Sequence, residues 1–276
     1  MDILLNRVFT NRQLNELVKT KSMKYAIKAG ERYGIYKTNL PDLISSLYKY
    51  LGLHHRNEYF YKNQILNKIV LGRHSVNTTS ALRELPVAHS IADFIVINGK
   101  AQVYEIKTEL DTLHRLKQQI KDYYKAFEYV NVITDEKYLK SVVNEVDSDV
   151  GIYVLTKRNQ ISCKRKAKEH KENLDSFTMF KILRKAEFEK VILDNYNFLP
   201  SAGASKYYNE NFKLFSKLSL EKQQKSLTHL LKQRYLKRFK GKSSLIMDCP
   251  MELRELVYFS NLKDKEIKNI NKILNK

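Results

Sequence analysis

The sequence predicts an α/β fold of the α+β type, in which helices cover a mixed β-sheet. Two short apolar segments, residues 91–97 and 101–107, flank Asn98-Gly99, which is the strongest short-range signal for a β-hairpin. Residues 130–134 and 151–155 are also short and apolar, and a helical pattern separates them. Alternation of strand and helix is typical of a partly parallel sheet with helices on its faces.

The part of the chain before this sheet is predicted to be helical. Three segments have apolar side chains at helical spacing: residues 1–37, 38–51 and 56–71. Pro41 lies in the first turn of the second segment and Gly72 follows the third, as expected at helix ends. Residues 80–85 then predict the first strand of the sheet, which Pro86 closes.

Helices are also predicted between and after the remaining strands. Asp111 or Thr112 is placed to cap a helix over residues 113–127. Further helices are expected over residues 136–146, 180–193, 209–240, 252–259 and 265–274. We therefore expect three parts: a helical segment (1–55), an α/β core (56–156) and a basic, mainly helical region (157–276).

The hairpin contains two acidic residues in otherwise apolar strands. A two-residue loop would turn Asp93 away from Glu105, because alternate residues of a strand face opposite sides. A three-residue loop, 98–100, pairs Ile97 with Ala101 and places Asp93 opposite Glu105, with Cβ atoms about 4.5–5.5 Å apart. Two bare carboxylates at that separation would repel each other. We expect the three-residue loop and a divalent cation shared by the two carboxylates.

The net charge of +20 points to a polyanionic partner. Residues 1–155 carry 22 Lys and Arg against 17 Asp and Glu, a net charge of +5, whereas residues 156–276 carry 28 against 13, a net charge of +15. Nucleic acid is the expected partner, since phosphate contacts are made mostly by Lys and Arg. The expected nucleic-acid-binding residues are Arg73, Arg115, Lys164, Arg165 and Lys166.

The sequence gives no indication of a membrane or secreted location. Its two cysteines, Cys163 and Cys249, are too few for a zinc cluster or a disulfide framework. No apolar run approaches the 18 residues or so that a transmembrane helix requires. We expect a cytoplasmic protein that does not associate with membranes.

One stretch resembles a known group of enzymes. It contains E-L-P-V-A-H-S-I-A-D at residues 84–93, Y-E-I-K-T-E-L-D-T-L-H-R-L-K-Q-Q at residues 104–119, and Tyr123 four residues further on. An acid, then Glu-x-Lys, then Gln-x-x-x-Tyr on the next helix resembles the PD-(D/E)XK nuclease superfamily. Residues 84–127 resemble an uncharacterised bacterial family placed in it. Ala92 stands where proline usually precedes the first acid.

The resemblance implies an αβββαβ core, like that of restriction endonucleases, and hydrolysis of phosphodiester bonds that depends on Mg²⁺ or Mn²⁺. It implies that Asp93, Glu105 and the carbonyl of Ile106 bind the metal. Lys107 would lie near the attacking water, and Gln119 would complete the catalytic set. Additional candidate site residues are Glu84, Glu58, Tyr123 and His89, of which Glu84 and Glu58 are alternatives for a further acid.

Two other functions compete with a nuclease that prefers DNA to RNA. One is a catalytically silent module that keeps the fold and only binds nucleic acid. Binding alone does not require a lysine beside paired carboxylates, which favours the enzyme. The other is a toxin or an effector of phage or bacterial defence that cuts RNA or invading DNA. Its catalytic centre would be the same, so only its substrates would distinguish it.

Overall fold

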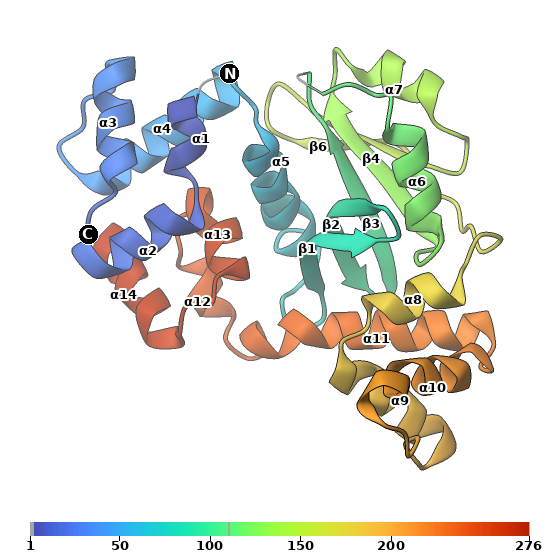
Figure 1. Cartoon of the computed structure of the whole chain (residues 1–276). Coiled ribbons are helices and arrows are strands. Elements are labelled where there is room, and N and C mark those ends of the chain that lie inside the picture. The colour runs from blue at the N-terminus through green and yellow to red at the C-terminus, as the bar shows by residue number, and fades with distance from the viewer. Residues whose placement is uncertain (1–2, 110, 276) are drawn as a thin grey trace. The chain divides into compact units, whose positions relative to one another are not determined.

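The computed structural model describes residues 3–109 and 111–275 (Figure 1). Contacts between residues divide the chain into two compact units. The first unit consists of Met1–Thr78, Leu155–Ile161 and Arg238–Lys276, and the second of Thr79–Val154 and Ser162–Lys237. Each unit therefore combines distant parts of the sequence. The division into three consecutive parts stays a prediction, because a unit defined by contacts need not be a segment that folds on its own.

The second unit is built on a six-stranded sheet in which the strands lie in chain order. The strands are β1 (Ser80–Val87), β2 (Ser90–Asn98), β3 (Lys100–Lys107), β4 (Tyr129–Asp135), β5 (Gly151–Leu155) and β6 (Ile161–Arg165). Strands β1, β2 and β3 are antiparallel neighbours, whereas β3 and β4 are parallel. The predicted mixed sheet is confirmed, and so is each strand that the sequence indicated. Strand β6, which alternates polar and apolar residues, was not predicted.

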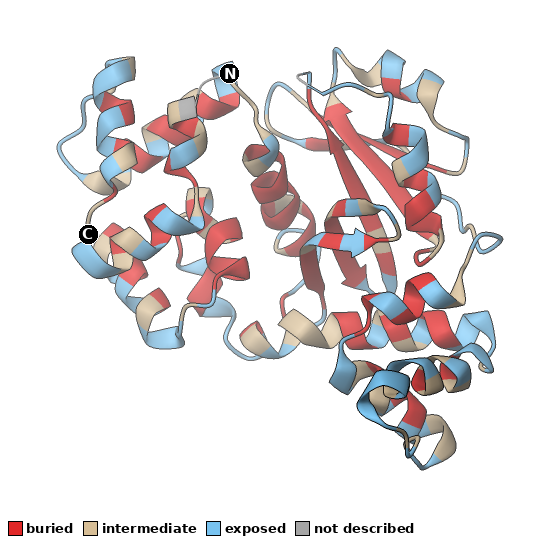
Figure 2. Ribbon diagram, viewed as in Figure 1, coloured by how far each residue is buried: buried red, intermediate tan, exposed pale blue. Residues whose placement is uncertain are grey.

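Helices cover this sheet and extend beyond it. They are α6 (Leu116–Tyr124), α7 (Leu139–Glu145), α8 (Ser176–Ile182), α9 (Lys185–Tyr196), α10 (Ala204–Ser216) and α11 (Leu220–Phe239). Helix α6 packs on β2 and β4, α7 on β4, and α8 on β1. The central strands are buried along most of their length (Figure 2). Tyr123, Phe127, Phe180 and Phe215 join the resulting apolar core.

The first unit is helical. Its helices are α1 (Ile3–Val8), α2 (Asn11–Thr20), α3 (Lys24–Tyr33), α4 (Leu40–His54), α5 (Glu58–Ile65), the π-helix η1 (Leu66–Val70), α12 (Ser243–Met247), the 3₁₀-helix η2 (Met251–Leu253), α13 (Arg254–Phe259) and α14 (Asp264–Leu274). Buried Asn63 joins two of them: its amide donates to the Tyr48 hydroxyl at 2.7 Å, and its Oδ1 accepts from the Glu255 N–H at 3.1 Å.

Two of the long predicted helices are each divided in the structure. The segment 180–193 is split at Leu183, which is extended, and Glu187 starts the second helix by accepting a hydrogen bond from the Arg184 N–H at 2.8 Å. The segment 209–240 is split between α10 and α11 at residues 217–219. Neither break contains proline or glycine. The helical spacing of apolar residues continues across both breaks, so the sequence predicted one helix in each place.

The elements α5, β1, β2, β3, α6 and β4 follow one another in the order αβββαβ. This order agrees with the coarse α+β expectation, and the assignment to a particular nuclease core is treated below as part of the proposal. Over the residues that the structure describes, no helix combines the length and the apolar character needed to cross a membrane.

Candidate active site

The β2–β3 hairpin directs Asp93 and Glu105 toward the same end of two adjacent strands. Ile97 pairs with Ala101, which is the register that the predicted three-residue loop requires. Following this register along both strands leads to Asp93 and Glu105. The backbone N–H of Ile106 donates a hydrogen bond to Oδ2 of Asp93 at 2.8 Å. The Asp93 carboxylate is therefore fixed across the gap between β2 and β3, beside Glu105.

Glu105 is the centre of a buried polar cluster. Its Oε1 accepts a hydrogen bond from Nζ of Lys107 at 2.8 Å, and its Oε2 accepts one from the hydroxyl of Tyr123 at 2.6 Å. Lys107 also donates to Oε1 of Gln119 at 2.9 Å. Glu105 is 1% exposed and Lys107 is 7% exposed. The structure thus brings together Glu105, Lys107, Gln119 and Tyr123, with Asp93 held next to them.

Tyr123 has more acceptors around it than it has protons. Its hydroxyl lies 2.6 Å from Oε2 of Glu105 and 2.7 Å from the carbonyl oxygen of Ile91. A hydroxyl carries one proton, so it can donate to only one of these oxygens at a time. Burial, followed by the negative charge of Glu105 and then that of Asp93, raises the pKa of Tyr123 far above its ordinary value. Tyr123 therefore stays protonated and acts as a donor.

Stability alone does not account for this cluster. Removing a lysine and a glutamate from water costs several kcal/mol per ion, and their attraction often only offsets that cost. An apolar pair of similar volume would serve the fold at least as well. Charged groups that are buried close together, as this lysine and the two carboxylates are, cluster at functional sites, which makes these residues candidates for a site.

The donor atoms of this cluster fit a hard divalent cation. Asp93 and Glu105 offer carboxylate oxygens, which Mg²⁺ prefers, and two carboxylates suffice because Mg²⁺ commonly keeps several waters. An ionised carboxylate has about four lone-pair positions, and the two hydrogen bonds to Glu105 occupy two of them. Within residues 3–109 and 111–275, no group of three or more His, Cys, Asp or Glu side chains is arranged to hold a metal.

Glu84 lies in a distorted part of β1 at the level of Asp93. Strand β1 pairs regularly with β2 on either side of it, at Arg83 with Phe94 and at Leu85 with Ala92. Glu84 itself has φ = 52°, in the left-handed region. For a residue other than glycine this conformation costs of the order of 1–3 kcal/mol and is found most often at functional sites. Its place between these two pairs puts Glu84 at the level of Asp93 on the neighbouring strand.

The other two additional candidates have surroundings of their own. Glu58 belongs to the first unit, and its carboxylate forms an ion pair with Lys62 at 2.6 Å. His89 lies in the turn between β1 and β2 and lines a separate cavity. The separation of four residues in sequence suggested that His89 could lie near Asp93. The extended strand β2, however, leads Asp93 away from the turn that contains His89.

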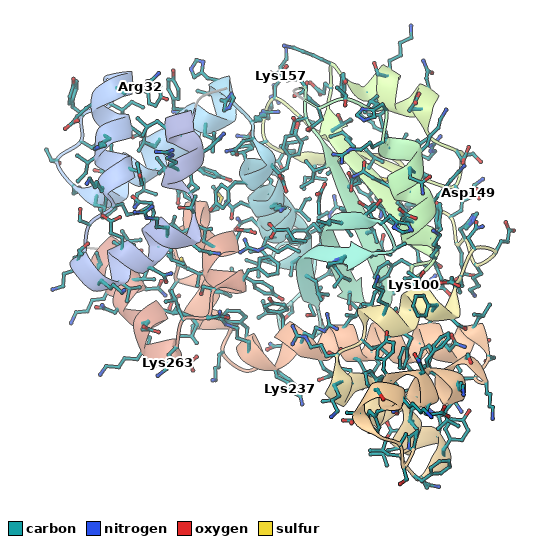
Figure 3. All side chains as sticks on the ribbon, viewed as in Figure 1. Arg32, Lys100, Asp149, Lys157, Lys237 and Lys263 are labelled. Carbon is teal, nitrogen blue, oxygen red and sulfur yellow. The ribbon has the colours of Figure 1, made fainter. Side chains whose placement is uncertain are left out.

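The expected nucleic-acid-binding residues differ in what their side chains contact. Arg165 donates to the carbonyl oxygens of Val150 and Asp147, both at 2.8 Å, so it stabilises the backbone. Arg73 donates to the carbonyl of Ile161 at 3.3 Å within the first unit. Arg73, Arg115, Lys164 and Lys166 are exposed. Long cationic side chains also project from many other positions, such as Lys157, Lys237 and Lys263 (Figure 3).

A large open cavity in the second unit was not predicted from the sequence. Its volume is about 1030 Å³, and it is lined by residues of α6, α8, the β1–β2 turn and the segment around His170. Asp93, Glu105 and Lys107 are not among its lining residues in the described part of the chain. Helix α6 contributes side chains to both the Glu105 cluster and the cavity. Gln119 and Tyr123 contact the Glu105 cluster, whereas other side chains of the helix line the cavity.

Comparison with known proteins identifies the family. The family model for bacteriophage P4 protein cII matches residues 53–247, more than half of the chain. Protein cII of Enterobacteria phage P4 is 33% identical over 147 residues, which cover 52% of this chain and 54% of that protein. A solved protein of unknown function from Silicibacter pomeroyi is 15% identical over 46% of this chain and 85% of that one, with a TM-score of 0.30. The extent of the family match shows that this chain belongs to the bacteriophage P4 protein cII family.

Proposed function

We propose that this protein is a metal-dependent nuclease with Asp93, Glu105, Lys107 and Gln119 as its catalytic residues. One observation carries the proposal: Lys107 is hydrogen bonded to buried Glu105, immediately beside a second carboxylate on the neighbouring strand. The resemblance of the acid, Glu-x-Lys and Gln-x-x-x-Tyr pattern to the PD-(D/E)XK superfamily supports the same assignment. The αβββαβ order of the elements agrees with it.

Asp93 and Glu105 would hold one Mg²⁺ or Mn²⁺ ion, with the carbonyl of Ile106 as the third oxygen that the resemblance implies. When bound, such an ion polarises a phosphoryl oxygen and makes a coordinated water more acidic. The hydrogen bond from Ile106 to Asp93 fixes one carboxylate, and the bonds from Lys107 and Tyr123 fix the other. The chain thus positions its oxygens before any ligand arrives.

Lys107 would act on the reacting phosphate and on the attacking water. An ammonium group has three donors, and the contacts to Glu105 and Gln119 use two of them. No partner for the third is found among the described residues. That N–H, held in place by Gln119, would orient the water and offset the negative charge that develops on the phosphoryl oxygens. The resemblance implies products with 5′ phosphates.

A second function is favoured by one feature of the same cluster. Both oxygens of Glu105 already accept hydrogen bonds within the protein. A module that only binds nucleic acid would keep such a satisfied cluster as part of its core. This module and the nuclease predict the same binding and differ in whether a phosphodiester bond is broken.

The test is a comparison of substrates and metals. We expect the protein to cleave linear, circular or single-stranded DNA, and RNA less readily, with Mg²⁺ or Mn²⁺ present. Cleavage should stop in EDTA, because the carboxylates alone cannot activate water at neutral pH. Gel analysis of each substrate with each metal measures this directly. Binding without cleavage of any of the four substrates with either metal would reject the nuclease and leave the binding module.

A further inference from the structure

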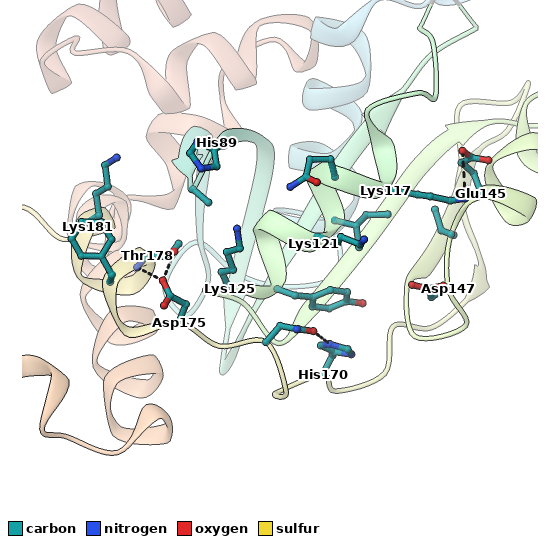
Figure 4. Close-up of a pocket in the computed structure, with 17 residues that line it drawn as sticks. His89, Lys117, Lys121, Lys125, Glu145, Asp147, His170, Asp175, Thr178 and Lys181 are labelled. Atoms are coloured by element: carbon teal, nitrogen blue, oxygen red, sulfur yellow. Dashed lines mark hydrogen bonds and ion pairs between the residues drawn. The ribbon is translucent and has the colours of Figure 1, made fainter.

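The open cavity of about 1030 Å³ lies entirely within the second unit. Lys117, Lys121 and Lys125 extend into it from α6, and Lys181 lies on the side formed by α8 (Figure 4). Lys117 and Lys121 of α6 and Lys125 at its C-cap are spaced at i, i+4 and i+8, so they lie in a row along one face. At 1.5 Å per residue, neighbours in this row are about 6 Å apart along the axis.

Two of these four cations have no acidic partner. Lys117 lies 3.8 Å from Glu145, and Lys125 forms an ion pair with buried Asp122 at 2.8 Å. Lys121 and Lys181 are exposed, and within the described residues neither forms an ion pair. The cavity therefore offers two uncompensated positive charges on opposite sides.

The acidic residues of the cavity are mostly engaged. Glu145 faces Lys117, as noted, and Asp175 caps α8 by accepting hydrogen bonds from the N–H and the hydroxyl of Thr178 at 2.7 and 2.6 Å. A carboxylate that caps a helix is partly neutralised by the N–H groups and by the helix dipole. Asp147 is the remaining acid and lies at the far side in Figure 4. An anionic ligand between Lys121 and Lys181 is thus favoured.

Aromatic rings adjoin these cations. Tyr124 and His170 are stacked on each other, with ring centroids 4.1 Å apart, and Tyr124 is only 5% exposed, whereas Phe177, which also lines the cavity, is 50% exposed. Nδ1 of His170 lies 3.4 Å from a carboxylate oxygen of Asp149, and Nε2 lies 2.6 Å from Oδ1 of Asn173. Burial opposes protonation, but these two bonds outweigh it and raise the pKa of His170.

We infer that this cavity binds a single strand of nucleic acid, with its phosphates on Lys121 and Lys181 and an unpaired base against the exposed ring of Phe177. Cations that follow the backbone combined with aromatic rings are the arrangement by which proteins bind single strands. In a duplex the base faces are stacked on one another and are not available to the rings. The inference rests on the proposed function, because it names the form of the substrate and where it binds.

The experiment measures binding of a fluorescent oligothymidylate by anisotropy in EDTA, where cleavage does not occur. Lys121→Glu/Lys181→Glu should weaken binding about tenfold or more. The plot of log K against log salt should become shallower by about 1.4, since each lost phosphate contact on a single strand contributes about 0.7. Phe177→Ala should weaken binding without changing that slope, because stacking releases no counterions.

The matched control is Lys206→Glu/Lys217→Glu, which makes the same change in net charge with two exposed lysines of α10 and its C-cap, outside the cavity. It should weaken binding by less than about threefold. Equal losses for the two double variants would overturn the inference, since net charge alone would explain them. An equal loss of duplex affinity in Lys121→Glu/Lys181→Glu would also overturn it, because the site would not require an unpaired strand.

Failure of this inference and failure of the nuclease proposal give different results. If the cavity variants lose binding but the wild type cleaves nothing with either metal, the cavity stands and the nuclease is rejected. If the wild type cleaves and the cavity variants bind normally, the nuclease stands and the cavity is rejected.

Discussion

At the scale of single residues, the cluster is determined by side-chain direction on one strand and one helix. Glu105 and Lys107 are two residues apart and therefore face the same side of β3. Gln119 and Tyr123 are four apart and face the same side of α6. Gln119 accepts a hydrogen bond from Lys107, and Tyr123 donates one to Glu105, so α6 supplies one contact to each of the two strand residues. A hydrogen-bonded network of this kind leaves a costly charge if one member is removed.

Lys107→Met is expected to lower the free energy of unfolding by about 3–5 kcal/mol, because it leaves the Glu105 carboxylate buried without a cation. Adding Glu105→Gln removes that charge, so the double variant should be more stable than the sum of the two single losses predicts. We expect a coupling energy of at least about 1 kcal/mol. Urea unfolding of the four proteins measures it, and strictly additive losses would contradict the cluster.

Much of this arrangement was predictable from the sequence. The hairpin signal at Asn98-Gly99 and the alternation of side chains predicted the register, which the pairing of Ile97 with Ala101 confirms. Gln119 and Tyr123 were candidates through the resemblance to the nuclease pattern, and both contact the cluster. The distortion at Glu84 was not predictable, because a left-handed φ at a glutamate depends on the surrounding strands and has no local sequence signal.

At the scale of elements, α6 contributes side chains both to the Glu105 cluster and to the lining of the cavity. Buried Asp122 holds this helix to the start of β2 by accepting hydrogen bonds from Ser90 at 2.9 Å and Lys125 at 2.8 Å. Burial alone would raise the pKa of Asp122, but the bonds from Lys125 and Ser90 lower it. The helix was predicted to begin near Asp111 or Thr112. It begins at Leu116, because Asp111 instead accepts from the N–H and hydroxyl of Thr108.

Helices α9 and α11 are joined by an ion pair that gives a pH-dependent stability. Both carboxylate oxygens of Glu187 accept from Arg234, at 2.7 and 2.6 Å. Burial would raise the pKa of Glu187, but the bonds from Arg234 and from the Arg184 N–H outweigh it and hold the pKa below its ordinary 4.5. Because the pKa of Glu187 is lower in the folded than in the unfolded protein, its ionised carboxylate stabilises the fold at pH values above the unfolded pKa. This contribution is lost as the pH falls through the folded pKa.

Glu187→Gln should therefore cost roughly 2–4 kcal/mol near pH 7, somewhat less than for a fully buried pair. The difference from the wild type should stay constant down to about pH 5 and shrink below pH 4.5. Asp194→Asn on the same helix is the control, because its exposed pair with Lys190 is worth at most about 0.5 kcal/mol. If the difference in the free energy of unfolding between Glu187→Gln and the wild type does not change with pH, the ion pair between Glu187 and Arg234 is not the source of the stabilisation.

At the scale of the whole molecule, composition predicted the helical and basic character but not the division into units. Each unit is assembled from segments that are far apart in the sequence. The large cavity was missed for the same reason. Its walls come from α6, α8 and the segment around His170, so it exists only after these elements have packed. Lysines at 117, 121 and 125 gave a periodic pattern that is common on solvated helices.

The nuclease assignment is tested most directly by Asp93→Asn. Asparagine keeps an oxygen that can accept from the Ile106 N–H, so the hairpin should remain intact, but the carboxylate charge is lost. The measurement is the single-turnover rate of DNA cleavage at saturating Mn²⁺ and enzyme, with Asp194→Asn as the matched control on exposed α9. We predict a loss of on the order of a hundredfold or more for Asp93→Asn, since the metal site contributes several kcal/mol of transition-state stabilisation, and a near wild-type rate for the control. A folded Asp93→Asn protein that cleaves as fast as the wild type would contradict a catalytic centre at Asp93, Glu105 and Lys107.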